Sequence, residues 1–229
     1  MSTSKSNTNE STNESTPAFS LTPKLSTSKE GVKTIRIVLV LDESGSMEPN
    51  RKEIIQTVNK FIKEQQELVA ENECLLTLIK FNDTCSAIID DQPIKNIKPI
   101  SLEQYKPDGM TSLYDAIGQV FVNFSENNNV ILVIMTDGLE NSSKLYKQSQ
   151  IKTFINKYTD PKTFAWNIIY LSADPMLSTQ GENIGVSSDP TRGTSNVSTN
   201  FEQLDQYYRT TLTRAISNYR TGLSRNVTL

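Results

Sequence analysis

The sequence contains no histidine among its 229 residues, so it lacks the usual side chain for proton transfer near neutral pH and the commonest nitrogen ligand of zinc. Serine-protease chemistry and histidine zinc sites are therefore excluded. The charge is nearly balanced, with 23 basic and 26 acidic residues, which gives no field that would favour nucleic acid or an anionic membrane as a partner. A Gly-rich segment ending in Gly-Lys-Ser/Thr is also missing, and this excludes a phosphate-binding P-loop.

Cysteine and long apolar runs are scarce too. Cys74 and Cys85 lie on adjacent strands of a predicted hairpin. A two-residue turn at Asn82-Asp83 would pair Lys80 with Cys85 and leave Cys74 beyond disulfide reach, so free thiols in a reducing compartment are expected. The N-terminus has no apolar core of a signal peptide, and no run reaches the length of a membrane span. We therefore expect a cytoplasmic protein.

The composition divides the chain into three parts. Residues 1–30 are rich in Ser, Thr and Asn and have too little apolar content to offset the entropy of ordering, which predicts a disordered tail. A solvated leader is the simpler interpretation of this tail, and a docking peptide is the alternative. Residues 31–223 have the length of one α/β domain with a well-buried core, and residues 224–229 form a short C-terminal tail.

Strand and helix patterns alternate along the predicted domain. Thr34–Leu41 is a nearly continuous β-branched and aliphatic run, and Val130–Met135 repeats the pattern; such runs are typical of parallel strands covered on both faces. Leu75–Phe81 with Thr84–Ile89 predicts a hairpin, and Thr163–Leu171 a further strand. Apolar residues at helical spacing form four stripes: Ile54, Val58, Phe61, Ile62 and Val69; Leu113, Ala116, Ile117, Val120, Phe121 and Phe124; Ile151, Phe154, Ile155 and Tyr158; and, after a helix cap at Asn200, Leu204, Tyr208, Leu212, Ala215, Ile216 and Tyr219. This alternation predicts a doubly wound α/β fold with one antiparallel sheet edge.

Two carboxylates follow the two apolar strands. The first strand ends in Asp42-Glu43-Ser44-Gly45-Ser46, and Asp137 follows the second in Thr-Asp-Gly. The carboxyl ends of parallel strands form the edge at which open α/β sheets bind ligands. Two aspartates close together there would repel each other and lose solvation, a cost that a bound cation offsets. Ser44 and Ser46 can aim their oxygens in the same direction, and such hard donors suit Mg²⁺ or Mn²⁺.

A further oxygen donor is expected from the loop Pro107–Ser112, which precedes the second amphipathic helix. Thr111 is the candidate. Each serine or threonine could instead cap the helix that follows it, with Asp115 as the capping-box partner of the second helix, and Asp137 could begin a turn. Three such loops together are much harder to explain as unrelated caps.

At these residues the sequence resembles the von Willebrand factor A, or integrin I-type, family, whose metal-ion-dependent adhesion site has this three-loop signature. The matching residues are Asp42, Ser44, Ser46, Thr111 and Asp137. The wording DESGSM, GMTSLYDAIG and MTDGLENSS is most similar to small cytosolic bacterial and phage members, over about residues 32–223. Those relatives often carry a Gly-Ala-Asn-Gln-Asp-like stretch after the final strand, where this chain has Leu171–Pro175, so no role carries over to Asp174.

The resemblance implies a doubly wound, mostly parallel six-stranded sheet with one antiparallel edge strand and helices on both faces. It also implies adhesion rather than turnover, with Mg²⁺ or Mn²⁺ held by the signature residues and an exposed Asp or Glu of a partner protein at a remaining coordination position. No nucleic acid and no membrane is implied as partner. The residues expected on the rim of such a site are Glu43, Met47, Met110, Glu140 and Asn141, for each of which an ordinary solvated loop position is the simpler interpretation.

Other classes of function stay open. A phosphatase of the haloacid dehalogenase type would use Asp42 as a nucleophile beside magnesium, but it requires a second aspartate at the position of Ser44. A two-metal nuclease would need more carboxylates, for which the candidates are Asp108, Asp115 and Asp174. An assembly scaffold would use a helical face and no metal. The combined five-residue signature favours cation-dependent protein binding over these alternatives.

Overall fold

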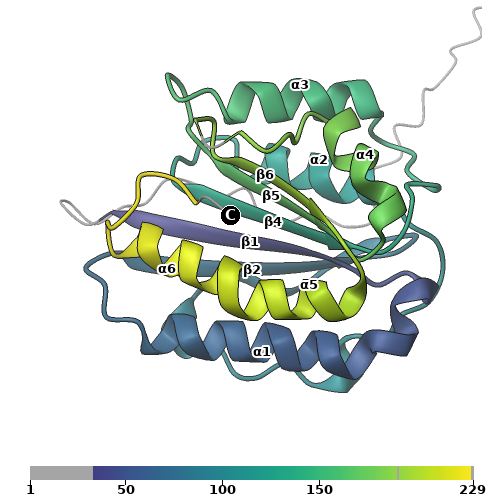
Figure 1. The fold of residues 1–229 in the computed structure, drawn as a ribbon, viewed down its shortest axis with the longest axis horizontal. Helices are drawn as coiled ribbons and strands as arrows, with labels where there is room; N and C mark the ends of the chain where they lie inside the picture. Colours follow the sequence, from purple (N-terminus) through teal and green to yellow (C-terminus); the bar gives the residue numbers. More distant parts are fainter. Residues whose placement is uncertain (1–32, 190, 228–229) are drawn as a thin grey trace, which may run out of the picture.

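The computed structural model describes residues 33–189 and 191–227, and its centre is a six-stranded sheet with the order β3-β2-β1-β4-β5-β6 (Figure 1). The strands are β1 Thr34–Asp42, β2 Glu73–Phe81, β3 Cys85–Pro93, β4 Val130–Thr136, β5 Asn167–Ser172 and β6 Thr194–Ser198. Every pairing is parallel except that of β3 with β2. The predicted mostly parallel sheet with one antiparallel edge strand is thus confirmed.

Helices cover both faces of the sheet, as predicted (Figure 1). They are α1 Arg51–Glu67, α2 Leu113–Asn123, α3 Gln148–Tyr158, α4 Ser178–Asn183, α5 Phe201–Tyr207 and α6 Thr213–Arg220, with a π-helical turn Tyr208–Leu212 joining the last two. Short 3₁₀ turns span Gly45–Asn50, Ile94–Asn96, Leu102–Gln104 and Pro175–Leu177. Helices α1, α5 and α6 pack on one face, and α2 and α3 on the other.

Successive side chains of β1 point to opposite faces of the sheet, so this one strand contributes to two hydrophobic cores. Ile37 and Leu39 belong to the core under α1, whereas Val38 and Val40 point into the core under α2 and α3. Because both faces of the strand are covered, all nine of its residues are buried. In the second core, the fully buried Trp166 stacks on Phe121 with a centroid distance of 5.4 Å.

The hairpin between β2 and β3 has a turn one residue longer than predicted. Phe81 pairs with Cys85, so the loop contains Asn82, Asp83 and Thr84. The side chain of Asn82 stabilises this loop because its Oδ1 accepts a hydrogen bond from the Thr84 N–H at 3.0 Å. Both cysteines are buried and unpaired, in agreement with the prediction of free thiols.

Two further boundaries differ from the sequence prediction. Helix α1 ends at Glu67, so Val69 lies beyond the apolar stripe and is 92% exposed. Strand β5 begins at Asn167, because the predicted start at Thr163 lies in a turn in which Ala165 has a φ of 53°. The apolar stripe thus predicted a helix α1 that is longer than observed, and the composition of residues 163–171 predicted a strand β5 that is longer than observed.

The segment after β5 contains more regular structure than its composition suggests. It holds the 3₁₀ turn Pro175–Leu177, helix α4 and the edge strand β6. Asn200 caps α5 as predicted, since its side chain accepts a hydrogen bond from the Gln203 N–H at 2.9 Å. All six residues of the predicted final stripe are buried.

The predicted tail at residues 1–30 lies outside the described residues. Within the predicted C-terminal tail, Val227 is fully buried, and its N–H donates to Asn167 Oδ1 at 2.8 Å. Among the helices of the described ranges, none is both long and apolar enough to cross a membrane.

Candidate metal centre

Three loops meet at the carboxyl edge of the sheet. The first loop follows β1 (residues 42–46), the second precedes α2 (residues 105–112), and the third follows β4 (residues 137–147). Strands β1 and β4 are parallel neighbours, and Leu41 pairs with Met135. Asp42 and Asp137 therefore lie at the same edge of the sheet. The two ends are distant in the sequence, since Thr136, whose hydroxyl donates to Asp42, lies 94 positions after it. The parallel topology thus brings the predicted residues together.

Asp42 is completely buried at the end of β1. Its Oδ1 accepts a hydrogen bond from the Ser44 N–H at 2.7 Å, and its Oδ2 accepts one from Thr136 Oγ1 at 2.5 Å. Burial raises the pKa of Asp42 to about 6, and the negative charge of Asp137 adds to this increase. No lysine or arginine of the described residues forms an ion pair with Asp42.

The two serines of the first loop connect Asp42 to Asp137. The hydroxyls of Ser44 and Ser46 lie 3.1 Å apart, and Ser46 Oγ donates to Asp137 Oδ1 at 2.5 Å. Partial burial raises the pKa of Asp137, and the charge of Asp174 adds to the effect. The residues from the ends of β1 and β4 therefore form one continuous polar cluster.

Thr111 reaches the same cluster from the second loop. A methyl group placed on Gly138 would lie 3.1 Å from Thr111 Oγ1 and 3.8 Å from both Asp42 Oδ2 and Ser46 Oγ. Oxygens of the first and second loops thus converge beside Gly138 of the third loop, where any larger side chain would compete for the same space. Thr111 is 3% exposed, and its hydroxyl has no hydrogen-bond partner within the described chain.

Backbone hydrogen bonds hold the three loops against one another. The Gly45 N–H donates to the Gly109 carbonyl at 3.2 Å, which joins the first loop to the second. Thr111 and Asn141 join the second loop to the third through two bonds, from Asn141 N–H to the Thr111 carbonyl at 3.0 Å and from Thr111 N–H to Asn141 Oδ1 at 2.9 Å. Asn141, expected on the rim, therefore fixes the backbone of Thr111.

Glu140 has a similar bracing role that its sequence position did not indicate. Its Oε1 accepts hydrogen bonds from the N–H groups of Ser142 and Ser143 at 3.0 and 2.7 Å. Its Oε2 accepts from the N–H of Tyr114 at 2.9 Å, which ties the third loop to the first turn of α2. A carboxylate three residues after Asp137 can be recognised in the sequence, but its backbone partners follow only from the folded loop.

Asp115 supports the third loop from α2. Its carboxylate accepts hydrogen bonds from the N–H groups of Lys144, Leu145 and Tyr146 at 2.8, 2.9 and 2.9 Å. Asp115 is therefore not the capping-box partner considered above, and Ser112 makes no side-chain cap bond. Asp174 likewise accepts from the N–H of Met176, at 2.9 Å.

Two of the expected rim residues are not on the surface. Met47 is fully buried in the core under α1, because the 3₁₀ turn that follows Ser44 directs it inward. Glu43 is 6% exposed, and its Oε1 accepts from Lys80 Nζ at 2.8 Å and from Lys106 N–H at 2.5 Å. Met110 does lie on the surface and is 49% exposed.

The donor set fits a hard divalent cation. It comprises the two carboxylates of Asp42 and Asp137 and the three hydroxyls of Ser44, Ser46 and Thr111. Within the described ranges, no group of three or more Asp, Glu or Cys side chains is arranged to hold a metal, so a carboxylate-rich or thiolate site is not the type found here. Oxygen donors of this kind match the preferences of Mg²⁺ and Mn²⁺.

Comparison with known families agrees with the arrangement of these loops. The family model of the von Willebrand factor type A domain matches residues 37–210, a range that includes most of β1, all of β4 and all three loops. The chain belongs to the von Willebrand factor type A domain family. No curated protein matches the sequence.

Solved structures show the same fold at low sequence identity. Proximal thread matrix protein 1 from the mussel byssus has a TM-score of 0.60 and 14% identity, over 83% of this chain and 47% of its own. The pilus adhesin SpaC from Lactobacillus rhamnosus GG, in an open conformation, has a TM-score of 0.60 and 14% identity, over 84% of this chain and 31% of its own. A further structure of the mussel protein has a zinc-occupied metal-ion-dependent adhesion site (MIDAS) motif. It has a TM-score of 0.53 and 16% identity, over 78% of this chain and 47% of its own. This chain therefore spans less than half the length of these solved chains.

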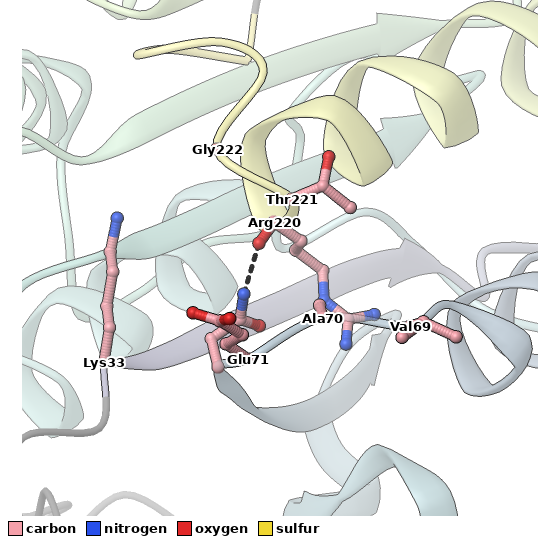
Figure 2. Close-up of a pocket in the computed structure, with 8 residues that line it drawn as sticks. Lys33, Val69, Ala70, Glu71, Arg220, Thr221 and Gly222 are labelled. Carbon is pink, nitrogen blue, oxygen red and sulfur yellow. Dashed lines mark hydrogen bonds between the residues drawn. The ribbon is translucent and has the colours of Figure 1, made fainter.

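The von Willebrand factor type A (vWA) domain also has an open cavity of about 490 Å³ at the opposite, amino end of the parallel strands (Figure 2). Lys33, Glu71, Asn72 and Arg220 are among its lining residues. The amide of Asn72 donates to the Arg220 carbonyl, and Arg220 Nη1 donates to the Gln65 carbonyl and Oε1, both at 2.9 Å. These bonds attach α6 to α1 and to the start of β2, so the cavity residues have a structural role far from the candidate metal centre.

Proposed function

We propose that this vWA domain binds a divalent cation, Mg²⁺ or Mn²⁺, and uses it to capture an exposed Asp or Glu of a partner protein. The observation that carries this proposal is the convergence of Asp42, Ser46 and Thr111 oxygens on one point beside Gly138. The buried Asp42 carboxylate has no basic partner there, and the Thr111 hydroxyl has no hydrogen-bond partner in the described chain.

The residues divide into two roles. Asp42 and Asp137 supply the negative charge that attracts the cation, and Ser44, Ser46 and Thr111 supply neutral oxygens. A cation held by few charged ligands keeps its attraction for an additional carboxylate, which is the chemistry it would supply when bound. Glu140, Asn141 and Asp115 act indirectly, because they fix the loop backbones on which the donors lie.

The donor chemistry supports Mg²⁺ or Mn²⁺ rather than zinc as the bound ion. The mussel protein described above has zinc in its MIDAS motif. In this chain histidine is absent and both cysteines are buried, with their pKa values raised by burial to about 11 and about 12. Oxygen-only donation favours the harder ions. Calorimetric competition between Mn²⁺, Mg²⁺ and Zn²⁺ measures this preference.

Adhesion without turnover is supported by the surroundings of the site. Ser44 stands where a haloacid dehalogenase-type phosphatase requires its acid/base aspartate. The carboxylates of Asp115 and Asp174 accept backbone N–H bonds, so they are engaged elsewhere than at a second metal. We also propose a reducing, cytoplasmic location, which the two unpaired thiols support.

The test compares two buried threonines, one at the candidate metal centre and one in the interior of β2. Thr111→Val removes a hydroxyl with no protein partner, so it should weaken cation and partner binding while costing the free energy of unfolding less than about 1 kcal/mol. Thr77→Val removes a buried hydroxyl that accepts the Asp91 N–H at 2.9 Å, so it should cost about 1 kcal/mol and leave cation binding unchanged.

Mn²⁺ titration calorimetry, urea denaturation and protein capture in Mg²⁺ or excess chelator provide the measurements. The proposal requires partners that are captured in Mg²⁺, lost in chelator and lost by Thr111→Val. Equal cation binding by the two variants would contradict the assignment of Thr111, and capture that is the same in Mg²⁺ and chelator would contradict adhesion through the cation.

A further inference from the structure

Exposed apolar side chains occur in the segments that carry the candidate metal centre. Seven large hydrophobic residues of the described chain are exposed, and four of them, Met110, Leu139, Leu145 and Met176, lie in segments at the carboxyl edge. Leu145 is the least exposed of the four, at 42%, and lies farther along the third loop, whereas Met110, Leu139 and Met176 are 49%, 60% and 86% exposed. Exposed apolar residues beside a polar site are candidates for contact with a partner.

Of Met110, Leu139 and Met176, two are neighbours of site residues in the sequence, and the third lies in a segment that is bound to the third loop. Met110 directly precedes Thr111, and Leu139 directly follows Gly138. Met176 lies in the 3₁₀ turn before α4, and α4 is bound to the third loop through Gln180, whose Nε2 donates to the Gly138 carbonyl at 3.1 Å. The three apolar side chains therefore come from the second loop, the third loop and the segment packed on it.

The backbone that carries these side chains is held in place by hydrogen bonds. The Met110 N–H donates to Asp83 Oδ2 at 3.0 Å, and the Met176 N–H donates to Asp174 Oδ1 at 2.9 Å. Leu139 is flanked by two such bonds, from Gly138 N–H to Thr136 Oγ1 and from Glu140 N–H to Gln180 Oε1, each at 3.1 Å. Because these segments are already ordered, a partner that contacts the side chains pays less conformational entropy on binding.

The charge around the site limits the partner further. Asp108 and Asp174 lie in these segments, and Asp83 of the β2–β3 turn accepts the Met110 N–H. None of the three carboxylates forms an ion pair with a basic residue of the described ranges. A divalent cation would offset Asp42 and Asp137 and leave these outer carboxylates uncompensated. A partner with a run of acidic residues would be repelled by them, whereas one acidic residue can be attracted to the cation.

We propose that Met110, Leu139 and Met176 form an apolar rim that selects a partner segment with one Asp or Glu beside a large aliphatic residue and without further acidic neighbours. This inference rests on the proposed function, since the acidic residue must reach the cation for its neighbour to reach the rim. Residues of an extended segment follow one another at about 3.3 Å, so an aliphatic side chain one or two positions from the acid can contact the rim.

The experiment uses a displayed library of nine-residue peptides with a fixed central Asp and random flanks. The full chain is immobilised in Mn²⁺, and bound peptides are eluted with chelator. We expect enrichment of Leu, Ile, Met or Phe within two positions of the Asp and depletion of additional Asp and Glu. The triple variant Met110→Ser, Leu139→Ser, Met176→Ser should bind an enriched peptide about tenfold or more weakly and bind Mn²⁺ with unchanged affinity.

Val69→Ser combined with Leu223→Ser is the matched control, because these residues are 92% and 79% exposed and lie outside the three segments. The control should bind the enriched peptide like the original chain. Chelator-eluted peptides without aliphatic enrichment, or equal peptide binding by the triple variant, would overturn the rim while the cation-dependent function stands. If no peptide elutes with chelator, or no Mn²⁺ binds, the rim and the proposed function both fail.

Discussion

At the scale of single residues, Asp42 determines what the site can bind. Moving an ionised carboxylate out of water costs several kcal/mol unless hydrogen bonds and an opposite charge compensate. Asp42 has the hydrogen bonds, from Ser44 N–H and Thr136 Oγ1, but the nearby charge of Asp137 has the same sign. In the proposed site a bound cation would supply the missing opposite charge, and this would link metal affinity to the cost of folding through Asp42.

Replacing Asp42 by Asn should therefore have opposite effects with and without metal. In chelator at pH 7, Asp42→Asn should increase the free energy of unfolding by up to about 3 kcal/mol, because a pKa raised from 3.8 to about 6 measures the cost of keeping the group ionised. In saturating Mn²⁺ the same variant should be less stable than the original chain. Urea denaturation in both conditions measures the two differences.

Asp189→Asn provides the contrast. Hydrogen bonds from Thr191 lower the pKa of Asp189, so its replacement should not stabilise the protein in either condition. Destabilisation by Asp42→Asn in chelator would show that the carboxylate is favourable in the metal-free fold and would contradict this view of Asp42.

The pH dependence of stability follows from the same residue. Between pH 4 and 6 the folded metal-free chain retains a proton on Asp42 that the unfolded chain has lost, so the contribution of Asp42 to stability falls as the pH rises through this window. A cation binds the ionised form, and histidine is absent, so no imidazole titration overlaps. The increase in melting temperature on adding Mg²⁺ should thus grow from about pH 5 to about pH 7. Thermal denaturation with Mg²⁺ or chelator tests this, and a constant increase at all pH values would contradict it.

At the scale of elements, the strands and helices with strong patterns were predictable and the loops that brace the site were not. Unbroken apolar runs identified β1 and β4, and a clear stripe identified α2. The edge strand β6 has the sequence Thr-Ser-Asn-Val-Ser, whose polar residues carry no strand pattern, and three of its five residues are only partly buried. The hairpin turn was misjudged by one residue because the side chain of Asn82 stabilises the longer loop.

Glu140 supports the third loop through three backbone N–H groups that donate to its carboxylate. Glu140→Gln replaces an acceptor oxygen by a donor, so at least one of the bonds from Ser142, Ser143 or Tyr114 must be lost. We expect a loss of about 1–3 kcal/mol in the free energy of unfolding and weaker Mn²⁺ binding, because the loop also carries Asp137.

Glu71→Gln, at an exposed position on the opposite edge, is the control and should change neither quantity. Urea denaturation and Mn²⁺ calorimetry on both variants provide the comparison. If Glu140→Gln retains full stability and affinity, Glu140 is not required to hold the loop, and its support comes from other contacts such as those of Asp115.

At the scale of the whole molecule, parallel strand order explains why the sequence could predict that Asp42 and Asp137 meet at one edge of the sheet. Asp42 and Asp137 follow strands that pair side by side, and any doubly wound sheet places such residues at one edge. The bracing contacts of Asp115 and Asn141 depend on the path of a loop, which has no periodic signal. Burial of Met47 is of the same kind, because it results from a single 3₁₀ turn.

The most direct test is a calorimetric titration of Mn²⁺ into the full chain and into Asp42→Ala, with circular dichroism to confirm that both are folded. The convergence of the three loops predicts one cation per chain in the original protein and no binding in Asp42→Ala. Absence of binding in the original chain, or equal binding in both proteins, would contradict a cation site at the carboxyl edge of the sheet.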